Sequence, residues 1–207
     1  MAGLAALQPG AGFHYGHSTD LLGLLIAGME GAPLGEVLER RIFRPLGMTD
    51  TGFIVPPAKH DRRVALHGFD TQGRLTRLTV APGGATVAER PADMVYVSGG
   101  AGLWSTLDEH LAFGRLFLGD GAVDGVRLLK PQTLALMSTN QLTDEQRASA
   151  TTLGMPTFAP GNGFGLGLAV VTDPATAAVT HGRGGVGTAG SPAPMAEGGR
   201  LIRATDQ

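Results

Sequence analysis

The sequence of 207 residues contains no cysteine, which excludes disulfide bonds, thiolate metal sites and a cysteine nucleophile. It also lacks a basic cluster. Lysine and arginine total 16 against 18 acidic residues, a formal net charge of -2, and the longest basic runs are the pairs Arg40-Arg41 and Arg62-Arg63. This distribution argues against a nucleic-acid partner.

The first residues, MAGLAALQPGAGF, have no basic region, and Gly3, Gln8 and Pro9 interrupt their apolar run. The segment is typical of neither a signal peptide nor a membrane span, which favours a cytoplasmic location and no membrane partner. The compartment of a longer protein stays open, because a signal peptide would lie upstream of Met1.

The composition that remains is that of a globular chain, with 43% hydrophobic and 16% charged residues. Glycine is abundant at 33 residues, so we expect many turns and a site built from loops.

Hydrophobic spacing predicts a helix capped by Ser18, with Asp20 in its first turn and Gly31 at its end. A second helix after Pro33 should end at Pro45, and we expect the two to pack as an antiparallel pair. The apolar stripe predicted on the first helix consists of Leu21, Leu22, Leu25, Ile26 and Met29.

Further along the chain, residues 51–88 are predicted to form a loop followed by a hairpin around HGFDTQGRLTRLTV. A helix should follow Ser105-Thr106 and turn Leu107, Leu111, Leu116 and Phe117 toward a core. Another should begin at Pro131. Residues 163–171 predict a strand with glycines at alternate positions, so one face of the strand has no side chains and should be packed against closely. Residues 188–207 are predicted to form an irregular tail.

Tyr15 is the first candidate for chemistry, because it precedes a helix N-terminus that favours an anion. A tyrosine can act as a base if nearby cations lower its pKa, and the alternative is a rim tyrosine without a catalytic role. His14 and His17 are spaced to share a metal, but no third ligand is evident, so we expect hydrogen-bonding or surface histidines and no metal.

The sequence GRGGVG at 182–187 satisfies the dinucleotide-binding spacing, but TAGSPAP follows where a helix is required. We therefore expect no nucleotide cofactor and interpret these glycines as a strand edge or an oxyanion-binding element. No G-x-S-x-G elbow, P-loop or paired-carboxylate spacing is present.

Five segments taken together resemble the serine β-lactamase and penicillin-binding-protein-like hydrolases, most nearly the class C-like carboxylesterases of family VIII. The resemblance implies an α+β fold, a partial β-lactamase/transpeptidase-like fold. It would have a helical lobe from residues 16–44 and 105–140 and part of an antiparallel sheet from 160–186, in a domain spanning 1–187. The segments are YGHSTDLLG (15–23), IFRPLGMTDTGF (42–53), SGGAGLWST (98–106), DGVRLLKPQTLALMSTNQL (124–142) and NGFGLGLAVV (162–171).

In that family a Ser-x-x-Lys serine attacks an acyl carbon, while the lysine and the tyrosine of a Tyr-x-Asn motif handle its proton. The resemblance assigns Tyr15 as the base and puts His17 at the asparagine position. HGRGGVGT at 181–188 is similar to the third, substrate-binding motif, with Arg183 in place of a tryptophan. It implies substrate contacts from Arg183, Gly184, Gly185 and Val186.

The nucleophile of that family has no counterpart here, because none of the six serines is followed three residues later by lysine. We therefore expect a C-terminal fragment of a serine hydrolase of small-molecule esters or β-lactams, acting through an acyl-enzyme and inactive in this form. A non-catalytic relic or binding module is the alternative. Sheet edges left open by missing strands predict self-association.

Overall fold

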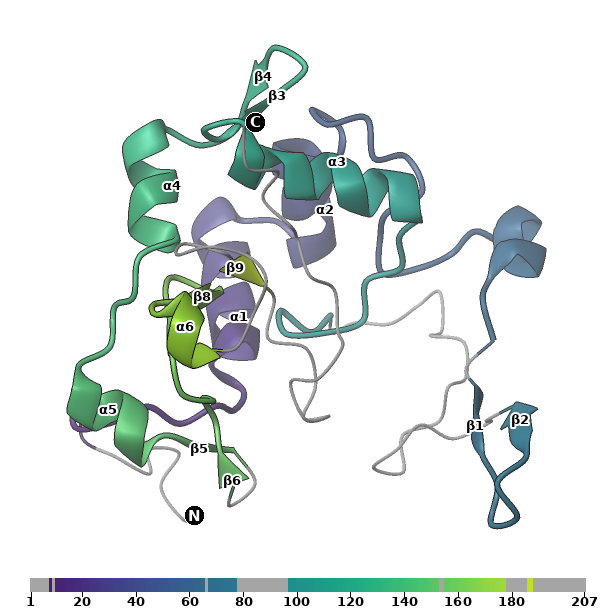
Figure 1. Ribbon diagram of the computed structural model, residues 1–207. Helices are drawn as coiled ribbons and strands as arrows, with labels where there is room; N and C mark the ends of the chain where they lie inside the picture. The colour runs from purple at the N-terminus through teal and green to yellow at the C-terminus, as the bar shows by residue number, and fades with distance from the viewer. Residues whose placement is uncertain are drawn as a thin grey trace, which may run out of the picture. The chain divides into compact units, whose positions relative to one another are not determined.

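The computed structural model describes residues 8, 10–65, 67–77, 97–152, 155–177 and 186–187 (Figure 1). The chain divides into two compact units, Asp20–His110 and Met1–Thr19 with Leu111–Gln207. Helices α1 (Ser18–Glu30) and α3 (Leu107–Leu118) run from one unit into the other. Helices and short antiparallel strands make up the α+β fold that the sequence predicts.

Helix α1 has the predicted limits. Asp20 lies in its first turn, and the left-handed Gly31 (φ +61°) follows its end, where the Ala32 N–H donates to the Ala27 carbonyl at 3.2 Å. The next helical segment consists of α2 (Leu34–Leu38) and a π-helical turn, η1 (Glu39–Phe43). Its direction differs from that of α1 by 78°, so the predicted antiparallel pair is wrong. The extended backbone of Pro33 turns the chain there without reversing it.

The core of the unit Asp20–His110 forms around α2 and η1. Met48 is buried there, and its N–H donates to the Phe43 carbonyl at 2.8 Å across a turn that contains the left-handed Gly47. The buried apolar residues of this unit are Leu34, Val37, Phe43, Met48 and Phe53.

The predicted hairpin in this unit is confirmed. Strands β1 (His67–Phe69) and β2 (Leu75–Arg77) pair antiparallel, with Gly68 opposite Thr76. The Asp70 carboxylate holds the turn by accepting the backbone N–H groups of Gln72 and Arg74, each at 2.9 Å. A 3₁₀ segment, η2 (Pro57–Arg62), precedes the hairpin.

Helix α3 only partly matches its prediction. Leu116 is buried and Phe117 is half-buried, but Leu107 and Leu111 are exposed. After α3, strands β3 (Ala122–Val123) and β4 (Val126–Arg127) pair through Asp124 and Gly125, whose positive φ values suit a tight two-residue turn.

The other unit carries short helices and a small sheet. Helix α4 (Pro131–Met137) begins at the predicted proline, and α5 (Asp144–Ser149) begins with a capping box between Thr143 and Gln146. Strands β5 (Thr151–Thr152) and β6 (Met155–Pro156) pair antiparallel. The three-stranded sheet has the order β7 (Asn162–Phe164), β8 (Ala169–Val171), β9 (Val186–Gly187), and α6 (Pro174–Ala177) follows β8.

The single strand predicted over 163–171 is wrong, because these residues form a hairpin. The Gly165 N–H donates to the Leu168 carbonyl at 2.8 Å, and Gly167 adopts φ +77° in the turn. The close packing predicted for the glycines is confirmed at Gly163 and Gly165 but not at Gly167, which has nothing within 4 Å of its Cβ position. A Cβ atom on Gly163 would overlap the Asn140 side chain, and one on Gly165 would overlap the Met137 carbonyl.

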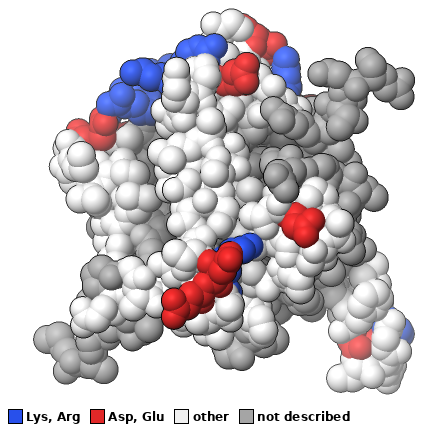
Figure 2. All heavy atoms as spheres, turned by 60° about the vertical axis from the view of Figure 1, so that its left-hand side comes forward, with Lys and Arg blue, Asp and Glu red and all other residues white. Residues whose placement is uncertain are grey.

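No single helix among the described residues is long and apolar enough to span a membrane. Helix α1 and the α2–η1 segment reach that length and composition only jointly, across their 78° bend. Figure 2 shows one face of the molecule, where small groups of charged side chains are separated by wide uncharged areas. The predicted tail, 188–207, lies outside the described residues, so its boundary stays a prediction.

Candidate functional site

The segment leading to Tyr15 is fixed on the unit that carries the three-stranded sheet. The Phe13 ring packs against Phe158 and Phe164, with centroids 5.2 and 5.0 Å away. His14 forms a parallel bridge with Thr151, and the Gln146 amide donates to the Gly10 carbonyl at 2.8 Å. These contacts anchor the chain up to the residue before Tyr15.

Tyr15 is half-buried and lies three residues before Ser18, the first residue of α1. A helix N-terminus presents backbone N–H groups and the positive end of the helix dipole. His17 lies between them in the chain and is exposed.

The glycine-rich segment enters the same sheet through β9. Val186 pairs with Val170 and Gly187 with Ala169, and β8 in turn pairs with β7, whose Phe164 contacts Phe13. The Tyr15 segment and Val186 are thus attached to one sheet. Arg183, Gly184 and Gly185 lie outside the described residues, so their substrate contacts stay predictions.

Two polar side chains that the sequence analysis did not single out hold this sheet. Asn140 Oδ1 accepts the Phe164 N–H at 3.1 Å, and its Nδ2 donates to the Leu142 carbonyl at 2.7 Å. Arg147 Nη1 donates to the Asn162 carbonyl and to Thr172 Oγ1, both at 3.3 Å. Neither residue belongs to a recognisable motif, and the contacts join positions too far apart in sequence for periodicity to reveal.

The SGGAG segment at 98–102 binds the first turn of α1. Ser98 Oγ donates to the Asp20 carboxylate and accepts the N–H groups of Gly100 and Ala101 at 3.1 and 3.0 Å. Gly99 lies against Gly23 of α1, where a Cβ would come within 3.0 Å of the Gly99 Cα. This segment therefore fixes the start of the helix that follows Tyr15.

The TDTG sequence at 49–52 has a structural role. Thr51 Oγ1 donates to Glu109 at 2.6 Å, and the Asp50 N–H donates to the same carboxylate at 2.7 Å. Gly52 and Trp104 exchange two backbone hydrogen bonds. Hydrogen bonds from Lys59 and then Arg62 hold the pKa of the Asp50 carboxyl below its usual range.

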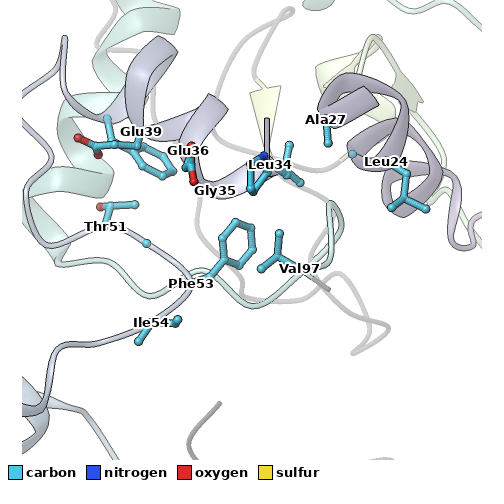
Figure 3. A pocket seen from close by; sticks show the side chains of 14 residues that line it. Leu24, Ala27, Leu34, Gly35, Glu36, Glu39, Thr51, Phe53, Ile54 and Val97 are labelled. Atoms are coloured by element: carbon cyan, nitrogen blue, oxygen red, sulfur yellow. The ribbon is translucent and has the colours of Figure 1, made fainter. Parts of the chain in front are cut away.

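An apolar cavity of about 510 Å³ lies within the unit Asp20–His110. Figure 3 shows the Phe53 ring and Val97 beside Leu34, with Leu24 and Ala27 contributed by α1 and the carboxylates of Glu36 and Glu39 at one end. Across the part of the chain that the structure describes, no three potential metal ligands come together.

Comparison with known proteins places these features in a family. The Beta-lactamase family model matches residues 4–194. Protein Rv1367c of Mycobacterium tuberculosis is 43% identical over 192 residues, which cover 91% of this chain and 46% of that protein. Esterase EstB of Burkholderia gladioli is 30% identical, over 83% of this chain and 42% of its own length.

A solved structure of EstCE1, described as a hydrolase with promiscuous acyltransferase activity, superposes with a TM-score of 0.65 at 27% identity. The superposition covers 86% of this chain and 45% of EstCE1. The chain thus spans about half the length of the relatives it matches. The matched residues include Tyr15, its anchoring sheet and the structural TDTG and SGGAG segments, and the chain belongs to the Beta-lactamase family of serine hydrolases.

Proposed function

We propose that this chain is the tyrosine-bearing half of a serine hydrolase that cleaves small carboxylic esters through an acyl-enzyme. The observation that carries the proposal is the position of Tyr15 directly before α1. Two residues earlier, the Phe13 ring packs against Phe164 of the sheet that also contains Val186. The name of Esterase EstB favours an ester over a β-lactam as the substrate.

In the proposed reaction a serine oxygen, outside this chain, forms a bond to the ester carbonyl carbon while its proton passes to the Tyr15 phenolate. Backbone N–H groups of residues 184–186 would stabilise the oxyanion. The alcohol leaves with the proton from Tyr15, and water then cleaves the acyl-enzyme by the same proton transfers. His17 and Arg183 would contact the substrate.

The chain alone has no Ser-x-x-Lys and is expected to turn over nothing. It should remain unlabelled by a fluorophosphonate serine probe and should not hydrolyse p-nitrophenyl butyrate. Saturable binding of a fluorescent acyl-β-lactam without turnover would favour the alternative, a non-catalytic binding module. Labelling of the chain alone would identify an unforeseen nucleophile.

The catalytic assignment is tested by joining the part of Rv1367c that this chain does not match to this chain. We expect hydrolysis of p-nitrophenyl butyrate, a loss in kcat of about 10²–10⁴-fold in Tyr15→Phe, and little change in the control His14→Gln, which alters an exposed neighbour. Equal rates for Tyr15→Phe and the parent would show that Tyr15 is not the base. If the joined protein hydrolyses nitrocefin but not p-nitrophenyl butyrate, the proposed substrate would be a β-lactam and not an ester.

A further inference from the structure

One side of α1 is apolar and exposed. Leu21, Leu22, Leu25 and Met29, four residues of the predicted stripe, are between 51% and 79% exposed. At 3.6 residues per turn these four fall within an arc of about 100°. Gly23, the one buried residue of α1, lies on the opposite side against Leu34 and Gly99.

The charged residues of α1 lie at its two ends, and each is bonded to a side chain outside the helix. Asp20 accepts from Ser98, and Glu30 pairs with Arg40 at 2.7 Å and Arg41 at 2.5 Å. Between Asp20 and Glu30 the helix carries no charge. A helix with an uncharged, exposed apolar stripe is typical of an element that packs against another surface.

We propose that the α1 face, defined as Leu21, Leu22, Leu25 and Met29, is the docking surface for the remaining half of the β-lactamase fold. This inference rests on the proposed function. Its support is that the matched relatives are about twice as long as the region shared with this chain, so a further stretch of comparable length accompanies that region in each of them. A second copy of this chain would cover the apolar side chains without supplying that half-fold.

The test uses the full chain and a tagged polypeptide made of the part of Rv1367c that this chain does not match. Capture is measured by biolayer interferometry. The double variant Leu22→Glu/Leu25→Glu should weaken binding at least ~10-fold, because two carboxylates would be buried without partners. The control Leu75→Glu alters a leucine that is 67% exposed in β2 of the same unit, and it should leave Kd within ~2-fold.

Circular dichroism checks that each variant is folded, and the single change Met29→Glu gives an independent reading if the double variant is not. No capture by the parent chain, or equal loss in Leu75→Glu, overturns the inference. So does a double variant that dissociates a dimer of the free chain while still capturing the tagged polypeptide, because the α1 face would then belong to a second copy. Capture without esterase activity would refute the proposed function and leave the docking surface intact.

Discussion

Gly165 occupies a position with no room for a side chain, because a Cβ would overlap the Met137 backbone carbonyl. Backbone atoms cannot rotate aside, so we expect Gly165→Ala to lower the free energy of unfolding by more than about 2 kcal/mol. Urea denaturation of the full chain measures this. Gly52→Ala is the control, since the nearest atom to its Cβ is 3.9 Å away, and similar values for the two variants would contradict the packing at Gly165.

The Asp50 carboxylate makes the stability of the folded chain decrease at acidic pH. Lys59 and Arg62 lower its pKa below the usual 3.8 in the folded chain. The stabilisation is therefore present above that value and is lost as pH falls through the folded pKa. We expect Tm to fall less between about pH 5 and pH 3 in Asp50→Asn than in the parent, as measured by thermal melts. The exposed neighbour Asp61 supplies the control Asp61→Asn, and an unchanged slope in Asp50→Asn would refute the argument.

Two glycines in helix α1 allow the effect of side-chain packing on stability to be measured separately from that of helix propensity. Gly28 has nothing within 4 Å of its Cβ position, so Gly28→Ala should raise the free energy of unfolding by about 0.5–1 kcal/mol. At Gly23 the new methyl would lie 2.9 Å from Leu34 Cδ2 and 3.0 Å from the Gly99 Cα, so the same propensity gain should be offset by crowding. Denaturant melts should rank Gly28→Ala above Gly23→Ala by at least ~1 kcal/mol. The reverse order would mean that the SGGAG segment does not rest on α1.

Local signals predicted the limits of α1, the start of α4 and the existence of the β1–β2 hairpin, because capping residues, prolines and turn residues act within a few positions of the chain. The direction of the α1 stripe was not predictable, since periodicity groups side chains on one side without indicating what covers it. The break at 165–168 was missed because alternating glycines suit both a bare strand side and a turn, and only Gly167 with its positive φ distinguishes them.

For the candidate site, resemblance assigned Tyr15 as the base and His17 to the asparagine position, whereas the residues alone left Tyr15 undecided between a base and a rim tyrosine. The Phe13, Phe158 and Phe164 cluster that anchors it was not foreseen, because its members come from distant segments with no shared pattern. Asn140 and Arg147 were missed for the same reason. The substrate contacts of Arg183, Gly184 and Gly185 still depend on the resemblance.

The molecule as a whole is expected to associate with itself when expressed alone. Its three-stranded sheet ends at β9, beyond which no further strand pairs among the described residues, and an open edge can recruit another chain. Light scattering during size-exclusion chromatography should give a mass above 21.3 kDa that rises with concentration. Leu25→Glu should not abolish this association, because the sheet edge lies elsewhere. A cooperatively melting monomer at every concentration would contradict the prediction.

The packing of Phe13 against Phe158 and Phe164 also affects how fast this chain assembles with a partner that carries the nucleophile. Two residues of extended chain span at most about 7 Å, so Tyr15 is tethered close to its cluster before any partner arrives. A partner that brings the nucleophile would then meet a tyrosine already in place. In stopped-flow mixing, regain of esterase activity should follow a single second-order phase set by encounter. Phe13→Ala should add a slower, concentration-independent phase in which the loosened segment finds its position.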